Sequence, residues 1–182
     1  MISLIALVII VLIGSFLVVG YNKGIKLKNY TQEAFSTMDV YLKKRWDLIP
    51  NLIETTKGYA QHEREILEEV TKLRNRNYTN LSDDEKIDLN YQIGFDLARL
   101  IAVAENYPDL KANENFQKLA DELSGIEAEI ATSRKYYNGC AREFKNFLEY
   151  FPTNLIGAFF NFEKPKFFEI DEKQRENVKV QF

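Results

Sequence analysis

The first 22 residues of the chain, from Met1 to Asn22, carry no charged side chain. Ile, Leu, Val, Phe and Ala make up most of this run. Because an α-helix rises about 1.5 Å per residue, roughly 20 apolar residues are enough to cross the hydrocarbon core of a bilayer. We therefore expect residues 1–22 to form a transmembrane anchor, and the rest of the chain to work beside a lipid surface.

A cleaved secretory signal is the competing interpretation of this run. Such a signal has a basic start, an apolar core of about 7–15 residues and a small-residue cleavage site. Here no Lys or Arg precedes the apolar residues, the run is longer, and no A-x-A-like site follows it. A retained helix is therefore favoured.

The charges that flank the run predict its orientation. Lys23, Lys26 and Lys28 follow the span directly, whereas only the α-amino group precedes it. The excess of basic residues on the cytoplasmic side of membrane helices places the N-terminus outside and the rest of the chain in the cytoplasm. Each lysine can add about 1 kcal/mol of attraction to anionic headgroups. The single cysteine, Cys140, fits a reducing compartment. We expect a single-pass protein of the cell membrane.

The composition after the anchor is typical of a helical bundle. Gly and Pro are scarce, with 8 and 4 residues in the whole chain, and charged residues of both signs make up 28% of it. From Trp46 onward the chain is net acidic, which argues against a nucleic-acid partner. We expect a cytoplasmic helical bundle over residues 23–150, followed by an apolar C-terminal segment and tail over residues 151–182.

Hydrophobic periodicity predicts the helices of this bundle. The strongest signal runs from Phe116 to Phe151, with apolar residues at alternating spacings of three and four, and Asn113 or Asn115 is a suitable N-cap. An earlier helix begins at the S-x-x-E capping box of residues 82–85 and ends before residue 107. The short connection between the two helices predicts an antiparallel hairpin.

Two further apolar stripes, over residues 27–49 and 52–73, are separated by Pro50. A proline inside a helix costs about 3 kcal/mol and disfavours helical geometry in the residue before it. We therefore expect two helices that meet at Trp46–Asn51, giving an antiparallel up-and-down four-helix bundle with long helices. A single helix kinked at Pro50 is the alternative. The segment after the last helix would lie close to the lipid in the first case and far from it in the second.

Residues with catalytic or metal-binding chemistry are few. One His and one Cys exclude most metal sites and catalytic triads, and no phosphate-binding or nucleophile-elbow motif is present. Cys140 falls on an apolar stripe, where a buried small side chain is the usual role. We expect a protein that is not an enzyme and holds no cofactor and no metal.

The segment after residue 150 is unusually rich in phenylalanine, so this apolar surface must be covered. It can cap the end of the bundle, or it can lie in the membrane interface, where Phe inserts and Lys reaches headgroups. The candidate membrane-contacting residues are Lys23, Lys26, Lys28, Phe159, Phe160 and Phe162.

Two stretches of the sequence, residues 41–60 and 107–116, resemble the conserved motifs of the LemA family, and residues 134–138 and 151–154 extend the match. The resemblance covers nearly the whole chain. It implies one N-terminal transmembrane helix with its N-terminus outside, and a helical-bundle domain. The family has no established enzymatic activity, so the resemblance implies no catalytic residues. Trp46 stands where the family often has Tyr.

The residues of these motifs have two interpretations. They can form sharp helix boundaries and capped turns, or both turns can cluster at the membrane-distal end of the bundle and form a docking surface for a partner. The candidate docking residues are Arg45, Trp46, Asp47, Asn51, Tyr107, Asp109 and Lys111.

The sequence thus predicts a non-catalytic scaffold or adaptor at the membrane, with an unidentified protein partner. A membrane-surface sensor, a regulator of a membrane-bound enzyme such as a protease, and an unrecognised hydrolase are the alternatives, in that order. Homo-oligomerisation through Gly14, Ser15 or Gly20 is also open.

Overall fold

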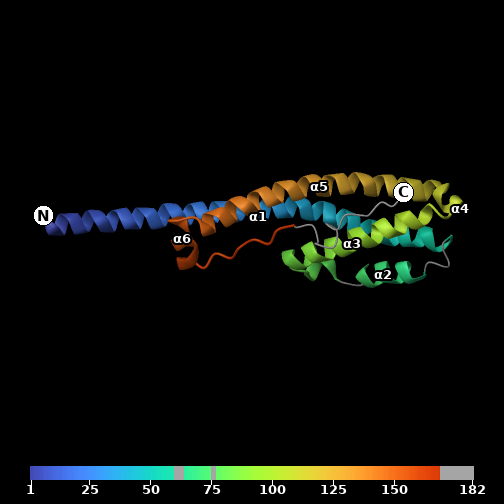
Figure 1. The fold of residues 1–182 in the computed structure, drawn as a ribbon, viewed down its shortest axis with the longest axis horizontal. Coiled ribbons are helices and arrows are strands. Elements are labelled where there is room, and N and C mark those ends of the chain that lie inside the picture. Colours follow the sequence, from blue (N-terminus) through green and yellow to red (C-terminus); the bar gives the residue numbers. More distant parts are fainter. Residues whose placement is uncertain (60–63, 75–76, 169–182) are drawn as a thin grey trace, which may run out of the picture. The chain divides into compact units, whose positions relative to one another are not determined.

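The computed structural model describes residues 1–59, 64–74 and 77–168. These residues form helices and short turns, with no strand among them (Figure 1), so the expected all-helical class is confirmed. The elements are α1 (Ile2–Lys57), α2 (Arg64–Arg74), the 3₁₀ turn η1 (Tyr78–Asn80), α3 (Asp83–Ala104), α4 (Pro108–Lys111), α5 (Glu114–Glu149) and α6 (Thr153–Phe159).

Helix α1 continues through Pro50 and ends at Lys57. The helix boundary expected at Trp46–Asn51 is therefore wrong, and the break lies between the end of α1 and the start of α2. Ile49, Leu52 and Ile53 are all buried around the proline. Burial of each such side chain stabilises the fold by about 1.5–3 kcal/mol. The three contributions together exceed the cost of about 3 kcal/mol for a proline in a helix. The antiparallel four-helix arrangement stays a prediction.

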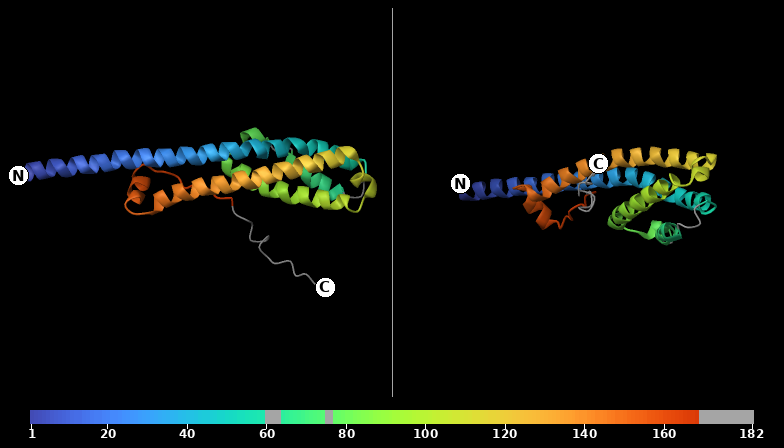
Figure 2. Two further views of the ribbon diagram at one scale, coloured as in Figure 1. Left: turned by 90° about the horizontal axis from the view of Figure 1, so that it is seen from above. Right: turned by 45° about the vertical axis from the view of Figure 1, so that its right-hand side comes forward.

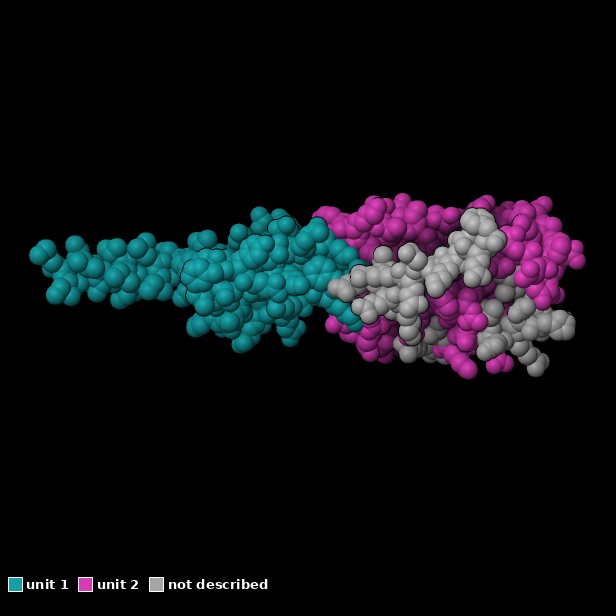
Figure 3. Space-filling model, viewed as in Figure 1, with its two compact units in different colours: residues 1–31, 138–182 teal, residues 32–137 magenta. Residues whose placement is uncertain are grey.

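The chain packs into two compact units, coloured separately in Figure 3. Unit 1 consists of residues 1–31 and 138–182, and unit 2 of residues 32–137. The two long helices, α1 and α5, each contribute residues to both units. The domain limits expected from the sequence, at residues 22 and 150, stay a prediction.

The core of unit 1 forms where α6 turns back toward α1 and α5 (Figures 1 and 2). Phe144, Phe147 and Leu148 of α5 and Ile156 of α6 form its buried cluster. The partly buried side chains packed against this cluster are Leu17, Leu27 and Phe162.

Unit 2 is built from the C-terminal part of α1, the N-terminal part of α5, and α2, α3 and α4 between them. Helix α2 lies beside α3 (Figure 2), with Leu67 and Val70 buried. The other helices of unit 2 bury apolar side chains as well. The fully buried ones include Met38, Ile49, Ile87, Leu89, Leu100, Leu110 and Ile130.

Both helix starts expected from the sequence are present. The Ser82 hydroxyl accepts a hydrogen bond from the Glu85 N–H at 3.3 Å, and the Glu85 carboxylate accepts one from the Ser82 N–H at 2.8 Å. This is the reciprocal capping box. At α5, the Asn113 side-chain oxygen accepts hydrogen bonds from the N–H groups of Asn115 and Phe116, so Asn113 is the N-cap.

Candidate functional site

Arg45 lies in the interior of unit 2, where its side chain is only 2% exposed. Its guanidinium donates hydrogen bonds to the backbone carbonyl of Asn90 at 2.9 Å and to the Asn90 side-chain oxygen. It also donates to the Glu127 carboxylate at 2.6 Å. Arg45 therefore ties α1 to both α3 and α5.

Trp46 is buried beside Arg45, with its ring centroid 5.3 Å from that of Tyr78. Two of the seven candidate docking residues are thus used for packing inside unit 2, where they present no exposed surface to a partner. The docking interpretation placed both side chains at a turn, facing a partner. Their burial depends on groups supplied by α3, α5 and η1, which are distant in the sequence.

A second polar cluster joins α1 to η1 and α3. Asp39 accepts hydrogen bonds from the Tyr78 hydroxyl at 2.5 Å and from the Lys86 ammonium at 2.6 Å. Burial raises the pKa of Tyr78 well above its usual value, and the hydrogen bond to Asp39 raises it further. The phenol therefore stays protonated and remains a donor throughout the physiological range.

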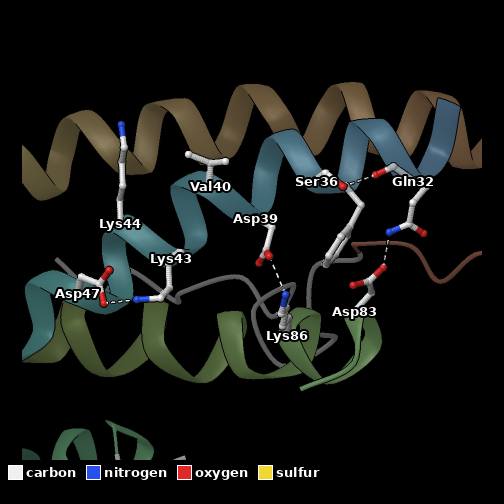
Figure 4. A pocket seen from close by; sticks show the side chains of 10 residues that line it. Gln32, Ser36, Asp39, Val40, Lys43, Lys44, Asp47, Asp83 and Lys86 are labelled. Carbon is white, nitrogen blue, oxygen red and sulfur yellow. Dashed lines mark hydrogen bonds and ion pairs between the residues drawn. The ribbon is translucent and has the colours of Figure 1, made fainter. Parts of the chain in front are cut away.

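Asp39 and Lys86 lie along an open groove of about 570 Å³ between α1 and α3 (Figure 4). Lys43 pairs with Asp47, Lys86 with Asp39, and Gln32 donates to Asp83 at 2.9 Å. The lining carries three lysines and three aspartates, so their charges balance. The balance removes the electrostatic attraction that an anionic small molecule would need.

The two sequence motifs meet at one end of unit 2. The Asn113 side-chain amide donates a hydrogen bond of 2.9 Å to the Tyr59 hydroxyl, which brings the turn after α3 beside the chain that follows α1. Leu110 of α4 is buried and holds this turn on the core.

The remaining docking candidates lie on α1 or in this turn with different exposure. Asp47, Asn51, Asp109 and Lys111 are exposed, and Tyr107 is half-buried. The Lys111 ammonium donates to Glu105 at 2.6 Å, an exposed pair that water screens.

The candidate membrane contacts all belong to unit 1. Lys23, Lys26 and Lys28 are exposed on α1 just after the apolar run. Phe159 is 69% exposed and Phe160 37% exposed. Phe162 is half-buried instead, and its ring packs 6.0 Å from that of Phe144, which makes it a structural contact.

Two glycines of α1 allow α6 and the chain after it to pack closely, a role that the sequence alone did not indicate. A Cβ at Gly20 would lie 2.8 Å from Cγ1 of Ile156, and one at Gly24 would lie 2.7 Å from Cε2 of Phe162. Side chains four positions apart lie on one face of a helix, so the pair forms a smooth strip that allows close approach. The G-x-x-x-G spacing of residues 20–24 is the sequence signal that could have found it.

Helix α1 contains one stretch long and apolar enough to cross a membrane, and none of that stretch is buried against the rest of the chain. Length and composition therefore fit a membrane anchor. Within residues 1–59, 64–74 and 77–168, no three His, Cys, Asp or Glu side chains are grouped to hold a metal ion. Cys140 is a half-buried free thiol, and His62 lies outside the described residues.

Comparisons with known proteins agree with this architecture. The chain is 27% identical over 159 residues to Protein LemA of Metamycoplasma hominis, covering 86% of this chain and 72% of that protein. It is 24% identical over 179 residues to the Magnetosome protein MamQ 1 of Paramagnetospirillum magneticum, covering 84% of this chain and 66% of that protein. Magnetosome protein MamQ of Magnetospirillum gryphiswaldense is 22% identical, with 65% of its length covered.

The chain thus spans just under two thirds of the length of the MamQ proteins. None of the three names specifies an enzymatic activity. The family model for LemA proteins matches residues 34–182, which is most of the chain and includes both motifs that meet in unit 2. The chain belongs to the LemA family.

Proposed function

We propose that this membrane-associated protein is a scaffold or adaptor whose unit 2 docks a protein partner. The observation that carries the proposal is the hydrogen bond between Asn113 and Tyr59, because it joins the two most distinctive stretches of the sequence at one end of one unit. The docking interpretation needs both stretches in one surface, and this bond shows that they are close enough to share one.

The chemistry of this end suits a protein surface better than a small molecule. Asp109 and Lys111 present opposite charges on α4, and Tyr59, which accepts the hydrogen bond from Asn113 after that helix, is 39% exposed. Mixed charges around an exposed aromatic ring are typical of the rim and centre of protein interfaces. In this proposal Asp47, Asn51 and Tyr107 lie at the edge of the same surface.

The positions of Lys23, Lys26 and Lys28 support an orientation with the N-terminus outside and unit 2 in the cytoplasm. A partner would then be a cytoplasmic protein or the cytoplasmic part of another membrane protein. A membrane-bound protease controlled by this chain would be one example of the second kind.

Photo-crosslinking in cells tests the proposal. The probe is placed at Asp109 or Lys111 in the full chain, and at the exposed Glu122 of α5 as a matched control. We expect the same protein to be captured from both α4 positions and not from the control. Capture should be lost from the Asp109 probe when Lys111→Glu is added, and from the Lys111 probe when Asp109→Lys is added. Circular dichroism verifies that the charge-reversed chain keeps its helices.

Two outcomes would contradict the proposal. Capture that is equal at Glu122 and at α4 would show non-specific proximity. Capture that survives the charge reversal would show that this end of unit 2 does not recognise the partner.

A membrane-surface sensor is the second candidate, favoured by the exposure of Phe159 and Phe160 on α6. In that role the contact with lipid carries the signal, so the α4 probes would capture no partner.

A further inference from the structure

Helix α6 has one buried and one exposed face. Ile156 and Gly157 are buried, and a Cβ at Gly157 would lie 2.9 Å from the Leu148 side chain. Leu155 and Phe159 are 56% and 69% exposed. Exposed apolar area of this kind is unfavourable in water, at roughly 25 cal/mol per Å². One face of the helix thus packs closely on the protein, while the other exposes the apolar side chains of Leu155 and Phe159.

The contacts of α6 lie at the end of the apolar run of α1. Ile156 contacts Gly20, and the Phe160 ring lies 4.6 Å from the ring of Tyr21. Lys23 is the first charged side chain after them. Since the helix rises about 1.5 Å per residue, Gly20 lies about 4–5 Å from the first charge along the axis. When α1 spans a bilayer, α6 therefore lies at the boundary between acyl chains and headgroups.

Exposed apolar side chains of α1 lie just before the glycine that Ile156 contacts. Val18 and Val19 of the apolar run are exposed and directly precede Gly20. At this depth a tyrosine can keep its ring among apolar groups and its hydroxyl near water, and Tyr21 lies at this position.

We propose that α6 is an interfacial helix whose exposed side chains insert into the leaflet from which α1 emerges. The inserted residues are Leu155 and Phe159 of α6, with Phe151 and Phe160 in the chain on either side of it. An interfacial helix of this kind buries its apolar face about 5–10 Å into the headgroup and acyl boundary. The proposal rests on the membrane anchor and is independent of any partner docked on unit 2.

The inserted face has a consequence for orientation. A single spanning helix can slide along the bilayer normal and change its tilt. A second contact at the side of α1 limits both movements, because vertical displacement or tilting away from α6 would withdraw the phenylalanines from the lipid. Unit 1 thereby has one preferred depth and one preferred direction of tilt in the leaflet.

Tryptophan quenching by brominated lipids tests the proposal in the full chain. The protein is reconstituted in vesicles of phosphatidylcholine and phosphatidylglycerol, with bromine placed near the ester carbonyl or near the methyl end of the acyl chains. Phe159→Trp and Leu155→Trp report on α6, and Phe95→Trp, an exposed phenylalanine of α3 in unit 2, is the matched control. The native Trp46 is buried, and its emission in the unaltered protein is the background.

We expect the emission of both α6 variants to shift to the blue and to lose intensity, more with bromine near the carbonyl than near the methyl end. The control should behave the same in brominated and plain vesicles. Agreement between the Phe159 and Leu155 variants excludes a local folding defect as the cause.

Two results would overturn the proposal. Equal emission of the α6 variants in brominated and plain vesicles would show that this face does not contact lipid. Emission that instead changes with the protein-to-lipid ratio would assign the face to a second copy of the chain. Neither result bears on the crosslinks from α4, so the two proposals can fail separately.

Discussion

Replacement of Arg45 by methionine tests whether the buried guanidinium holds unit 2 together. Methionine keeps most of the side-chain volume but removes the donors that reach Asn90 and Glu127. Asn90 is 3% exposed, so its side-chain oxygen would be left without a partner or water, at a cost of about 1–3 kcal/mol. The Glu127 side chain is 42% exposed and can turn to solvent.

The net change follows from these terms. Loss of the hydrogen bonds to the charged guanidinium costs about 1.5–3 kcal/mol, and this figure already includes part of the penalty at Asn90. Removal of the buried charge lowers the total cost, because the protein no longer has to desolvate it. We expect Arg45→Met to lower the free energy of unfolding by about 2–3 kcal/mol. The second substitution Asn90→Leu should recover most of this loss, because neither buried polar group then remains.

Trp46 is the natural probe, since it is the only tryptophan in the chain and lies beside Arg45 in unit 2. Urea unfolding of the full chain in detergent micelles is followed by its fluorescence, for the parent, both single variants and the double variant. A stability of Arg45→Met within about 0.5 kcal/mol of the parent would refute the reasoning. A double variant less stable than Arg45→Met alone would refute it as well.

Three further predictions concern other parts of the chain. Gly24→Leu should destabilise unit 1 by about 1–3 kcal/mol through overpacking, whereas Gly14→Leu should not, because the space around Gly14 is open. The rate of protease cleavage after residue 150 is the measurement that compares the two variants. Burial, and then the charge of Glu69, raise the pKa of Asp96, so its ionised form opposes folding at neutral pH. Asp96→Asn should therefore raise Tm at neutral pH, by an amount that shrinks as pH falls through the raised pKa; a constant gain would contradict this. Asn113→Ala should cost about 1 kcal/mol through loss of the α5 N-cap, measured by urea unfolding, with an unchanged midpoint as the contrary result.

Local sequence signals predicted the parts of the fold that depend on neighbouring residues. The capping box at Ser82 and the N-cap at Asn113 are formed by residues within a few positions of each other, so the sequence contains all their partners. The apolar run at the N-terminus could also be predicted, because its length and composition are enough to identify a candidate membrane span. The helix through Pro50 could not be predicted this way, since burial of its neighbours against other helices outweighs the local cost of proline.

In the candidate site, too, features set by neighbouring residues could be predicted and features set by distant residues could not. Exposure of Asp109 and Lys111 follows from a short polar turn, but the burial of Arg45 requires Asn90 and Glu127, which come from other helices. The sequence predicts the segment that contains α6 only as a cap on the bundle or a membrane contact, because the packing of Ile156 on Gly20 depends on residues far apart in the chain.

The seat of α6 also decides which faces of α1 remain open to other helices in a membrane. In many membrane proteins two small residues four positions apart allow a second helix to approach closely. Here Ile156 and Phe162 of the same chain already fill that place at Gly20 and Gly24. Self-association through these glycines and the folded state of α6 are thus mutually exclusive, and a dimer formed there would have to displace α6 first. Gly14, which has nothing within 4 Å, carries no such competitor.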